Sequence, residues 1–287
     1  MAATVQGSAT DVKQQEASTC PTCGETITRQ FCPACGEQKF DRHNFSFRHF
    51  VRHAAHELLE LDSKVLRTIR YLFSKPAFVT AGYLAGKRSQ FVNPFRLYVL
   101  CFALSTFLTS TYHPVLDFKN LSNADRTGKM NHALAKLANR KGVPEEVLVQ
   151  HMNERLHLYY EASKIFNALV MAGLLAIFYR RQKWYFGEHA VTSFYFLSFT
   201  LLLTIVKWPL WLALGAPVQS PSAYILSLIF LLIALPYLWV TLRQLHGEGP
   251  WKTAAKSVLV YGGTQLTIIV TTLVSFGLAV LHTVLVR

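Results

Sequence analysis

Two short cysteine turns near the N-terminus carry the clearest chemistry in the chain. Cys20 and Cys23 belong to one Cys-Pro-x-Cys-Gly turn, and Cys32 and Cys35 belong to the other. The proline presets φ and the glycine tolerates a left-handed conformation, so both thiolates of a turn can face one ion. Four such thiolates make the closed tetrahedral shell of a structural zinc site. We therefore predict a minimal zinc ribbon over residues 19–40 with structural Zn²⁺; two disulfides or four free thiols are the alternatives.

The apolar residues are distributed as in a membrane protein. The chain has 287 residues, of which 51% are hydrophobic, and these gather in long blocks. A helix needs roughly 20 mostly apolar residues to cross a bilayer. We expect an all-α integral membrane protein with about five transmembrane helices, preceded by the ribbon and, before that, by a disordered tail over residues 1–18. The predicted spans are Phe95–Thr111, Ile165–Tyr179, Ala190–Leu214, Tyr224–Leu242 and Ser257–Val286, within a bundle over residues 94–287.

Basic residues predict the orientation of the bundle. They are concentrated before the first span, between the second and third, and between the fourth and fifth. The positive-inside rule places these three connections and the N-terminus in the cytosol, and the C-terminus outside. A cytosolic ribbon remains reduced, which keeps its thiolates available to zinc. The loop over residues 113–163 is then extracytoplasmic, and helical spacing predicts two helices in it, over residues 129–140 and 144–160.

An amphipathic helix is predicted over residues 44–73, between the ribbon and the first span. Apolar residues recur at three- and four-residue spacing, and arginines and lysines occupy the other surface. This helix either lies on the membrane, where its basic residues attract anionic headgroups, or packs against the protein itself. Ser74-Lys75-Pro76 ends it, and Asn93-Pro94 provides a cap and a first-turn proline for the first span.

Other reactive groups have two interpretations each. His49, His53 and His56 share one helix face and could bind a second metal, although histidines on a polar helix are more often solvated. Glu188 and His189 open the third span, where they could form a proton relay or a substrate contact, or simply cap the helix.

Charged and small residues in the spans have less specific roles. Lys207 falls near the far interface, where its side chain could reach the headgroups. Cys101 is expected in the core. Gly262 and Gly263 indicate close helix packing, with a polar pathway as the second interpretation. The spans contain almost no acidic residues.

Several sequence stretches resemble the bacterial membrane-protein family called domain of unknown function 3667. They comprise the two cysteine turns, Tyr83–Arg88, Asn93–Tyr98, Glu188-His189, Arg243–Leu245 and Trp251–Thr253, and the most specific part is residues 20–98. The resemblance implies a ribbon followed by several spans in a bacterial cytoplasmic membrane. It implies no activity.

The sequence leaves two classes of function. No nucleophile elbow, phosphate-binding loop or zinc-protease motif is present, so we expect no enzyme and no catalytic residue. The first class is a scaffold or regulator whose ribbon docks a cytosolic protein partner. The second is a transporter or channel-like protein with a polar site near Glu188 and His189. Nucleic acid is not favoured as a partner, because Arg29 and Lys39 are the only basic residues near the ribbon. Binding to anionic lipid accounts better for the net charge of +13. The sequence is also compatible with a homo-oligomer.

Overall fold

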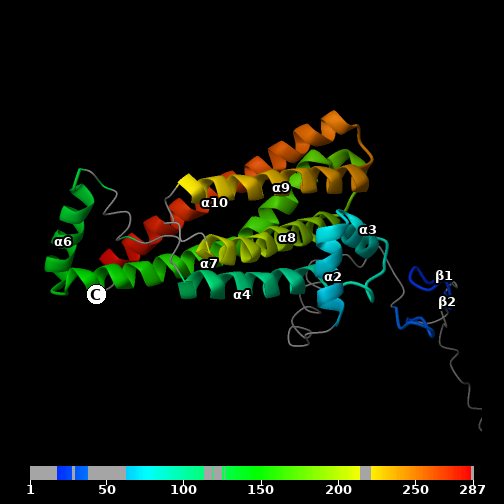
Figure 1. Ribbon diagram of the computed structural model, residues 1–287, viewed down its shortest axis with the longest axis horizontal. Coiled ribbons are helices and arrows are strands. Elements are labelled where there is room, and N and C mark those ends of the chain that lie inside the picture. The colour runs from blue at the N-terminus through cyan, green and yellow to red at the C-terminus, as the bar shows by residue number, and fades with distance from the viewer. Residues whose placement is uncertain are drawn as a thin grey trace, which may run out of the picture.

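Five long helices run lengthwise through the molecule, with the ribbon at one end of the bundle and the end of the last helix at the other (Figure 1). The computed structural model describes residues 18–27, 30–37, 63–112, 118, 125, 127–213 and 221–285. Residues 1–17 of the predicted tail and the three histidines of the helix before the membrane lie outside these residues, whereas Ser18 begins the first strand.

The five predicted spans correspond to five helices of the structure. They are α4 (Pro94–Tyr112), α7 (Glu145–Phe178), α8 (Phe186–Ala213), α9 (Pro221–His246) and α10 (Pro250–Leu285). Four of them are long and apolar enough to cross a membrane, while the apolar part of α4, Pro94–Leu108, is shorter. The all-α membrane fold is thereby confirmed, and α4 has the shortest apolar stretch of the five helices.

The third span, α8, lies at the centre of the bundle. It packs against α4, α7 and α9, whereas α10 covers α7 and α9. Its buried hydroxyls donate to carbonyls one turn earlier, as Ser193 does to His189 (2.9 Å) and Ser198 to Phe194 (2.7 Å). These bonds satisfy the hydroxyls inside the helix, which lets a central span carry polar residues.

Two short helices cover the ribbon end of the bundle. α2 (Ser63–Ser74) ends where the sequence predicts, and buries Val65, Thr68 and Leu72 against α3 and α8. This part of the predicted amphipathic helix therefore packs on the bundle; residues 44–62 lie outside the described residues. The sequence did not predict α3 (Phe78–Leu84), which follows a left-handed residue, Ala77, with φ of 65°.

The turn between α3 and α4 is held to its neighbours at its C-terminal end. Val92 donates its backbone N–H to the Thr68 hydroxyl (3.2 Å) and accepts a bond from the Tyr195 hydroxyl on its carbonyl oxygen (2.6 Å). The predicted cap of α4 is confirmed, since the Asn93 side chain accepts from the Phe95 N–H (3.0 Å). Residues 85–93, which we call the membrane turn, are thus bound to α2 and to the central helix.

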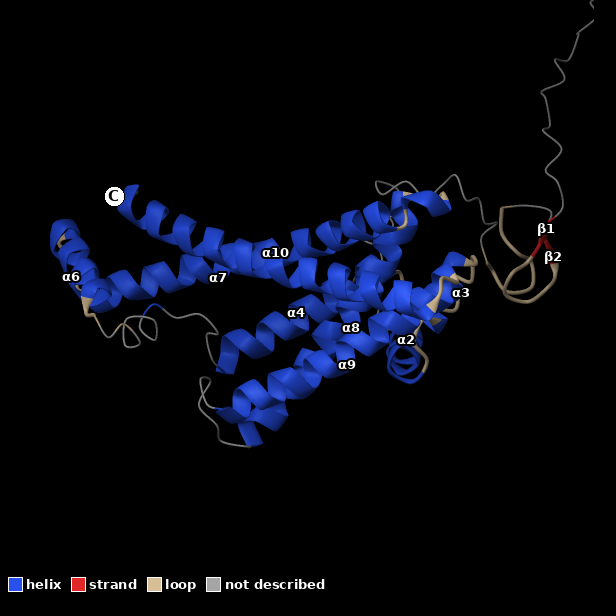
Figure 2. Ribbon diagram, turned by 90° about the horizontal axis from the view of Figure 1, so that it is seen from above, coloured by secondary structure: helices blue, strands red, loops and turns tan. Residues whose placement is uncertain are grey.

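The predicted helical elaboration lies at the end of the bundle away from the ribbon. α6 (Lys129–Lys141) packs against the start of α7, as both views show (Figures 1 and 2). Leu134 and Ala138 of α6, Leu148 of α7 and Ala279 of α10 belong to one buried apolar cluster. Because α7 is continuous for 34 residues, about 51 Å at 1.5 Å per residue, the predicted loop boundary at residue 163 is absent.

Candidate metal centre

The ribbon consists of two nearly identical turns and one short pair of strands. In the first turn the Cys20 N–H donates to the Glu25 carbonyl (2.7 Å), and in the second the Cys32 N–H donates to the Glu37 carbonyl at the same distance. Gly24 and Gly36 have φ of 79° and 71°, the left-handed conformation that the sequence predicts. β1 (Ser18–Thr19) pairs antiparallel with β2 (Thr26–Ile27) and brings the first turn back on itself.

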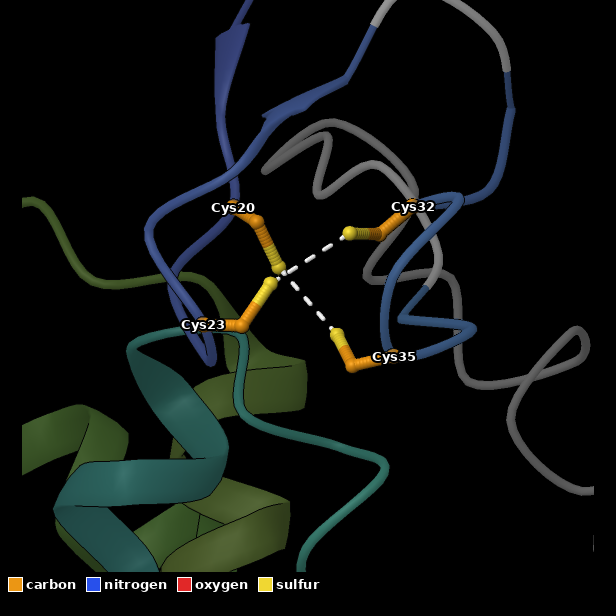
Figure 3. A group of neighbouring side chains, drawn as sticks. All are labelled: Cys20, Cys23, Cys32 and Cys35. Carbon is orange, nitrogen blue, oxygen red and sulfur yellow. Dashed lines mark hydrogen bonds between the residues drawn. The ribbon is translucent and has the colours of Figure 1, made fainter.

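The four cysteine sulfurs converge on one point between the turns (Figure 3). All lie within 4.8 Å of one another, with Cys20 Sγ 3.5 Å from Cys35 Sγ and Cys23 Sγ 3.4 Å from Cys32 Sγ. None of the four forms a disulfide, so the disulfide alternative is not the one the structure adopts. A tetrahedral zinc with Zn–S bonds of about 2.3 Å separates its sulfurs by roughly 3.8 Å, so the cluster fits a zinc ion with small adjustments.

The thiols differ in acidity because their surroundings differ. Burial would raise the pKa of the Cys20 thiol, but hydrogen bonds to the backbone at Cys23 and Thr22 outweigh it and lower the pKa to about 7. At Cys35 the backbone at Glu37 acts to lower the pKa, yet burial and the neighbouring cysteines raise it to about 12. Four thiolates cannot remain together without a cation, and a divalent metal would lower all their pKa values at once.

A buried glutamate joins the ribbon to the bundle. The Glu37 side chain is 2% exposed, and its Oε2 atom accepts from the Thr22 hydroxyl (2.8 Å), the Ser89 N–H (3.0 Å) and the Ser89 hydroxyl (2.7 Å). Glu25 occupies the same place in the first turn but is exposed. Ser89 belongs to the membrane turn, so the second cysteine turn is attached directly to the bundle. We call this contact the ribbon latch. No local sequence pattern predicts it, because Glu37 and Ser89 are 52 positions apart.

The predicted polar pair of the third span lies inside the bundle at its ribbon end. Glu188 accepts from the Tyr185 N–H (2.8 Å), which is the capping role that the sequence offered as one alternative. His189 is 1% exposed and stacks with Trp184, with ring centroids 5.7 Å apart.

A second histidine faces this pair from the end of α9. The His246 ring lies 6.1 Å from the His189 ring and is stacked on Tyr179 at 3.6 Å. Its Nδ1 atom pairs with Gln182 Oε1 (2.5 Å), while His189 Nδ1 and His246 Nε2 have no partner among the described residues. The structure thus brings together two imidazoles that lie far apart in the sequence.

Cys101 is buried in the main apolar cluster as expected, and takes no part in the metal centre. In the described part of the chain, the four ribbon cysteines form the one group of three or more ligating side chains close enough to hold a metal.

These features define a multi-span membrane protein with an N-terminal cluster of four cysteines that could hold a metal ion. The sequence model of one family, Protein of unknown function (DUF3667), matches residues 62–106, which confirms the resemblance drawn from the sequence. The match covers α2, α3, the membrane turn and α4 as far as residue 106, and does not include the ribbon. No curated protein and no solved structure shows a match to the chain.

Proposed function

We propose that the protein is a non-enzymatic membrane scaffold or regulator, whose zinc ribbon docks a protein partner on the cytosolic face of a bacterial cytoplasmic membrane. The observation that carries this proposal is the ribbon latch. A closed Cys₄ site offers a metal no open position for substrate, so its contribution is to shape a surface. The latch fixes that surface to the membrane turn through Glu37 and Ser89.

The ribbon also presents an apolar residue that its own core does not use. Phe31 is 56% exposed and directly precedes Cys32, whereas the buried core of the ribbon consists of Cys20, Ile27 and Cys32. An exposed aromatic ring on a small rigid module is a typical anchor for a protein partner. The basic connections predicted on this side would also attract anionic lipid.

Crosslinking in intact membranes tests the proposal. The Phe31→Ser variant should lose specific crosslinked proteins while retaining its metal and its place in the membrane. Glu25→Gln is the matched control, because Glu25 is an exposed residue of the same ribbon. Equal recovery of the same crosslinked proteins from the wild type, the control and Phe31→Ser would contradict the docking function.

The two imidazoles at the ribbon end favour a second candidate, a transporter or channel-like protein. His189 and His246 lie close together among the spans, and each has a ring nitrogen without a partner in the described part of the chain. In that case His189→Ala or Glu188→Gln should reduce solute or proton flux in reconstituted vesicles, and Phe31→Ser should leave the flux unchanged. The opposite pattern would exclude this candidate.

A further inference from the structure

A half-open cavity of about 680 Å³ lies among the spans, and all five of them contribute to its lining. Lys164 lies 14 residues from the ribbon end of α7 and Lys207 lies 21 residues from that end of α8, which are about 21 and 31 Å at 1.5 Å per residue. Leu197 and Tyr261 also line the cavity, and each lies 11 residues, about 17 Å, from the ribbon end of its helix. The cavity therefore lies in the middle part of the bundle, and its lining includes neither the metal-site cysteines nor the histidine pair.

Three charged side chains line this cavity. Lys164 contacts both carboxylate oxygens of Glu161 (2.6 and 2.8 Å), and Glu161 also accepts from the Thr106 hydroxyl (2.6 Å). Lys207 has no hydrogen bond or ion pair with any described residue, and it lines the cavity with the others. With His157 neutral, two lysines and one glutamate give the lining a net charge of +1.

Besides lying about 31 Å along α8, Lys207 lines the cavity. It shares this cavity with Glu161, which the sequence assigned to a loop outside the membrane. An ammonium group among spans is usually balanced by an opposite charge or lies along a substrate path. Among the described residues Lys164 already balances Glu161, and Lys207 has no opposite charge there.

A buried amide and an apolar wall complete the site. Asn167 is 5% exposed and lines the cavity, and its Oδ1 atom has no hydrogen-bond partner among the described residues. The apolar part of the lining includes Leu201, Leu228, Phe230 and Ile268. A volume of this size, a mostly apolar lining and a few polar groups are the features of a small-molecule site.

We propose that this cavity binds a singly charged anionic amphiphile, with its carboxylate or phosphate head near Lys207 and its hydrocarbon part along the apolar side chains of the lining. The Lys207 ammonium, which has no opposite charge among the described residues, selects one negative charge. The apolar lining selects a hydrocarbon portion. Such a molecule could be a membrane phospholipid or a free organic acid, and the two sources are separable by experiment. The proposal does not depend on the docking function of the ribbon.

Binding to the purified full-length protein in neutral detergent tests this proposal by native mass spectrometry. Dodecanoate is compared with methyl dodecanoate, and phosphatidylglycerol with phosphatidylcholine, so that each anion has an uncharged or zwitterionic match. We expect at least one anion to bind about tenfold more tightly than its match, the effect of one favourable charge contact. Preference for dodecanoate alone indicates a free acid, and preference for phosphatidylglycerol alone indicates a lipid. No preference in either pair would overturn the proposal.

Two variants with opposite expected effects separate a binding role from a structural one. Lys207→Gln should abolish the anion preference, whereas Glu161→Gln raises the net charge of the lining to +2 and should strengthen anion binding. Lys252→Gln, an exposed lysine at the start of α10, is the control and should bind as the wild type does. If Lys207→Gln does not fold, Glu161→Gln still decides, because weaker anion binding in that variant contradicts the proposal.

Discussion

The ribbon latch is the contact whose loss should be easiest to measure. Glu37→Gln keeps the shape of the side chain but removes its charge. The carboxylate accepts three hydrogen bonds from Thr22 and Ser89, all within 3.0 Å. A hydrogen bond to a charged group contributes about 1.5–3 kcal/mol and a neutral one about 0.5–1.5, so each bond should weaken by about 1 kcal/mol. Because the three bonds share one oxygen, we expect a total of about 2 kcal/mol, which is about a 30-fold change in the equilibrium between the latched and released ribbon.

Amide hydrogen exchange reports this change directly, because the Ser89 N–H is one of the three donors. In the Glu37→Gln variant the peptide containing Ser89 should lose protection by about 30-fold if opening of the latch limits exchange. Peptides from the centre of α8 should exchange as before. Glu25→Gln is the matched control, since Glu25 occupies the equivalent position of the first turn and is exposed.

Removal of the metal should also release the Ser89 N–H from the ribbon, because it unfolds the cysteine turns. The buried core of the ribbon consists of Cys20, Ile27 and Cys32, with Cys35 packed against it, which is too small to fold without metal. A chelator should therefore release Ser89 at least to the extent that Glu37→Gln does, and should release it further in that variant, where the three hydrogen bonds are weakened but still present. If protection of Ser89 is unchanged both by the substitution and by chelation, the reasoning from the latch is refuted.

Three other predictions concern the metal, the packing of the spans and the topology. The purified protein should contain one zinc per chain, and the double variant Cys23→Ser, Cys35→Ser should contain none by metal analysis; full occupancy in that variant would exclude the Cys₄ site. Gly263→Ile should lower the free energy of unfolding by about 1–3 kcal/mol more than Gly262→Ile does. A Cβ at Gly263 would lie 2.8 Å from Leu174 Cδ1, whereas one at Gly262 would meet open space. Equal melting temperatures of the two variants would contradict this prediction. A reporter fused to the C-terminus should be extracytoplasmic and one fused between α7 and α8 cytosolic, and a cytosolic C-terminus would show that the number of crossings is even.

Sequence reasoning located the features that depend on neighbours along the chain. The cysteine turns, the cap at Asn93 and the five apolar blocks are all local patterns, and the structure contains each of them. Glu161 was assigned to a loop because only the second half of α7 is strongly apolar. Helical spacing did predict a helix over residues 144–160 in the first half of α7. The packing of this half on α6 and α10 depends on residues far along the chain, and no local pattern reports it.

The burial of Glu37 is a second feature that the sequence alone does not predict. Both cysteine turns are followed by a glutamate, so the sequence offers two equivalent carboxylates. Burial distinguishes them, and it arises from contact with Ser89, a residue 52 positions away. The pairing of His189 with His246 also depends on how α8 and α9 meet.

The contacts between the ribbon and the central span determine which parts of the bundle a structural change at the metal site would affect. Glu37 holds Ser89, and three residues later Val92 is bound to Thr68 of α2 and Tyr195 of α8. The membrane turn is therefore attached to the ribbon on one side and to α8 on the other. The contacts of Val92 do not involve the ribbon, so release of Glu37 leaves them in place. A regulatory signal from the ribbon should accordingly act on the membrane turn and the surface around it. The lining of the cavity includes no residue of the ribbon or of the membrane turn, so the cavity should bind its ligand whether or not the latch is closed.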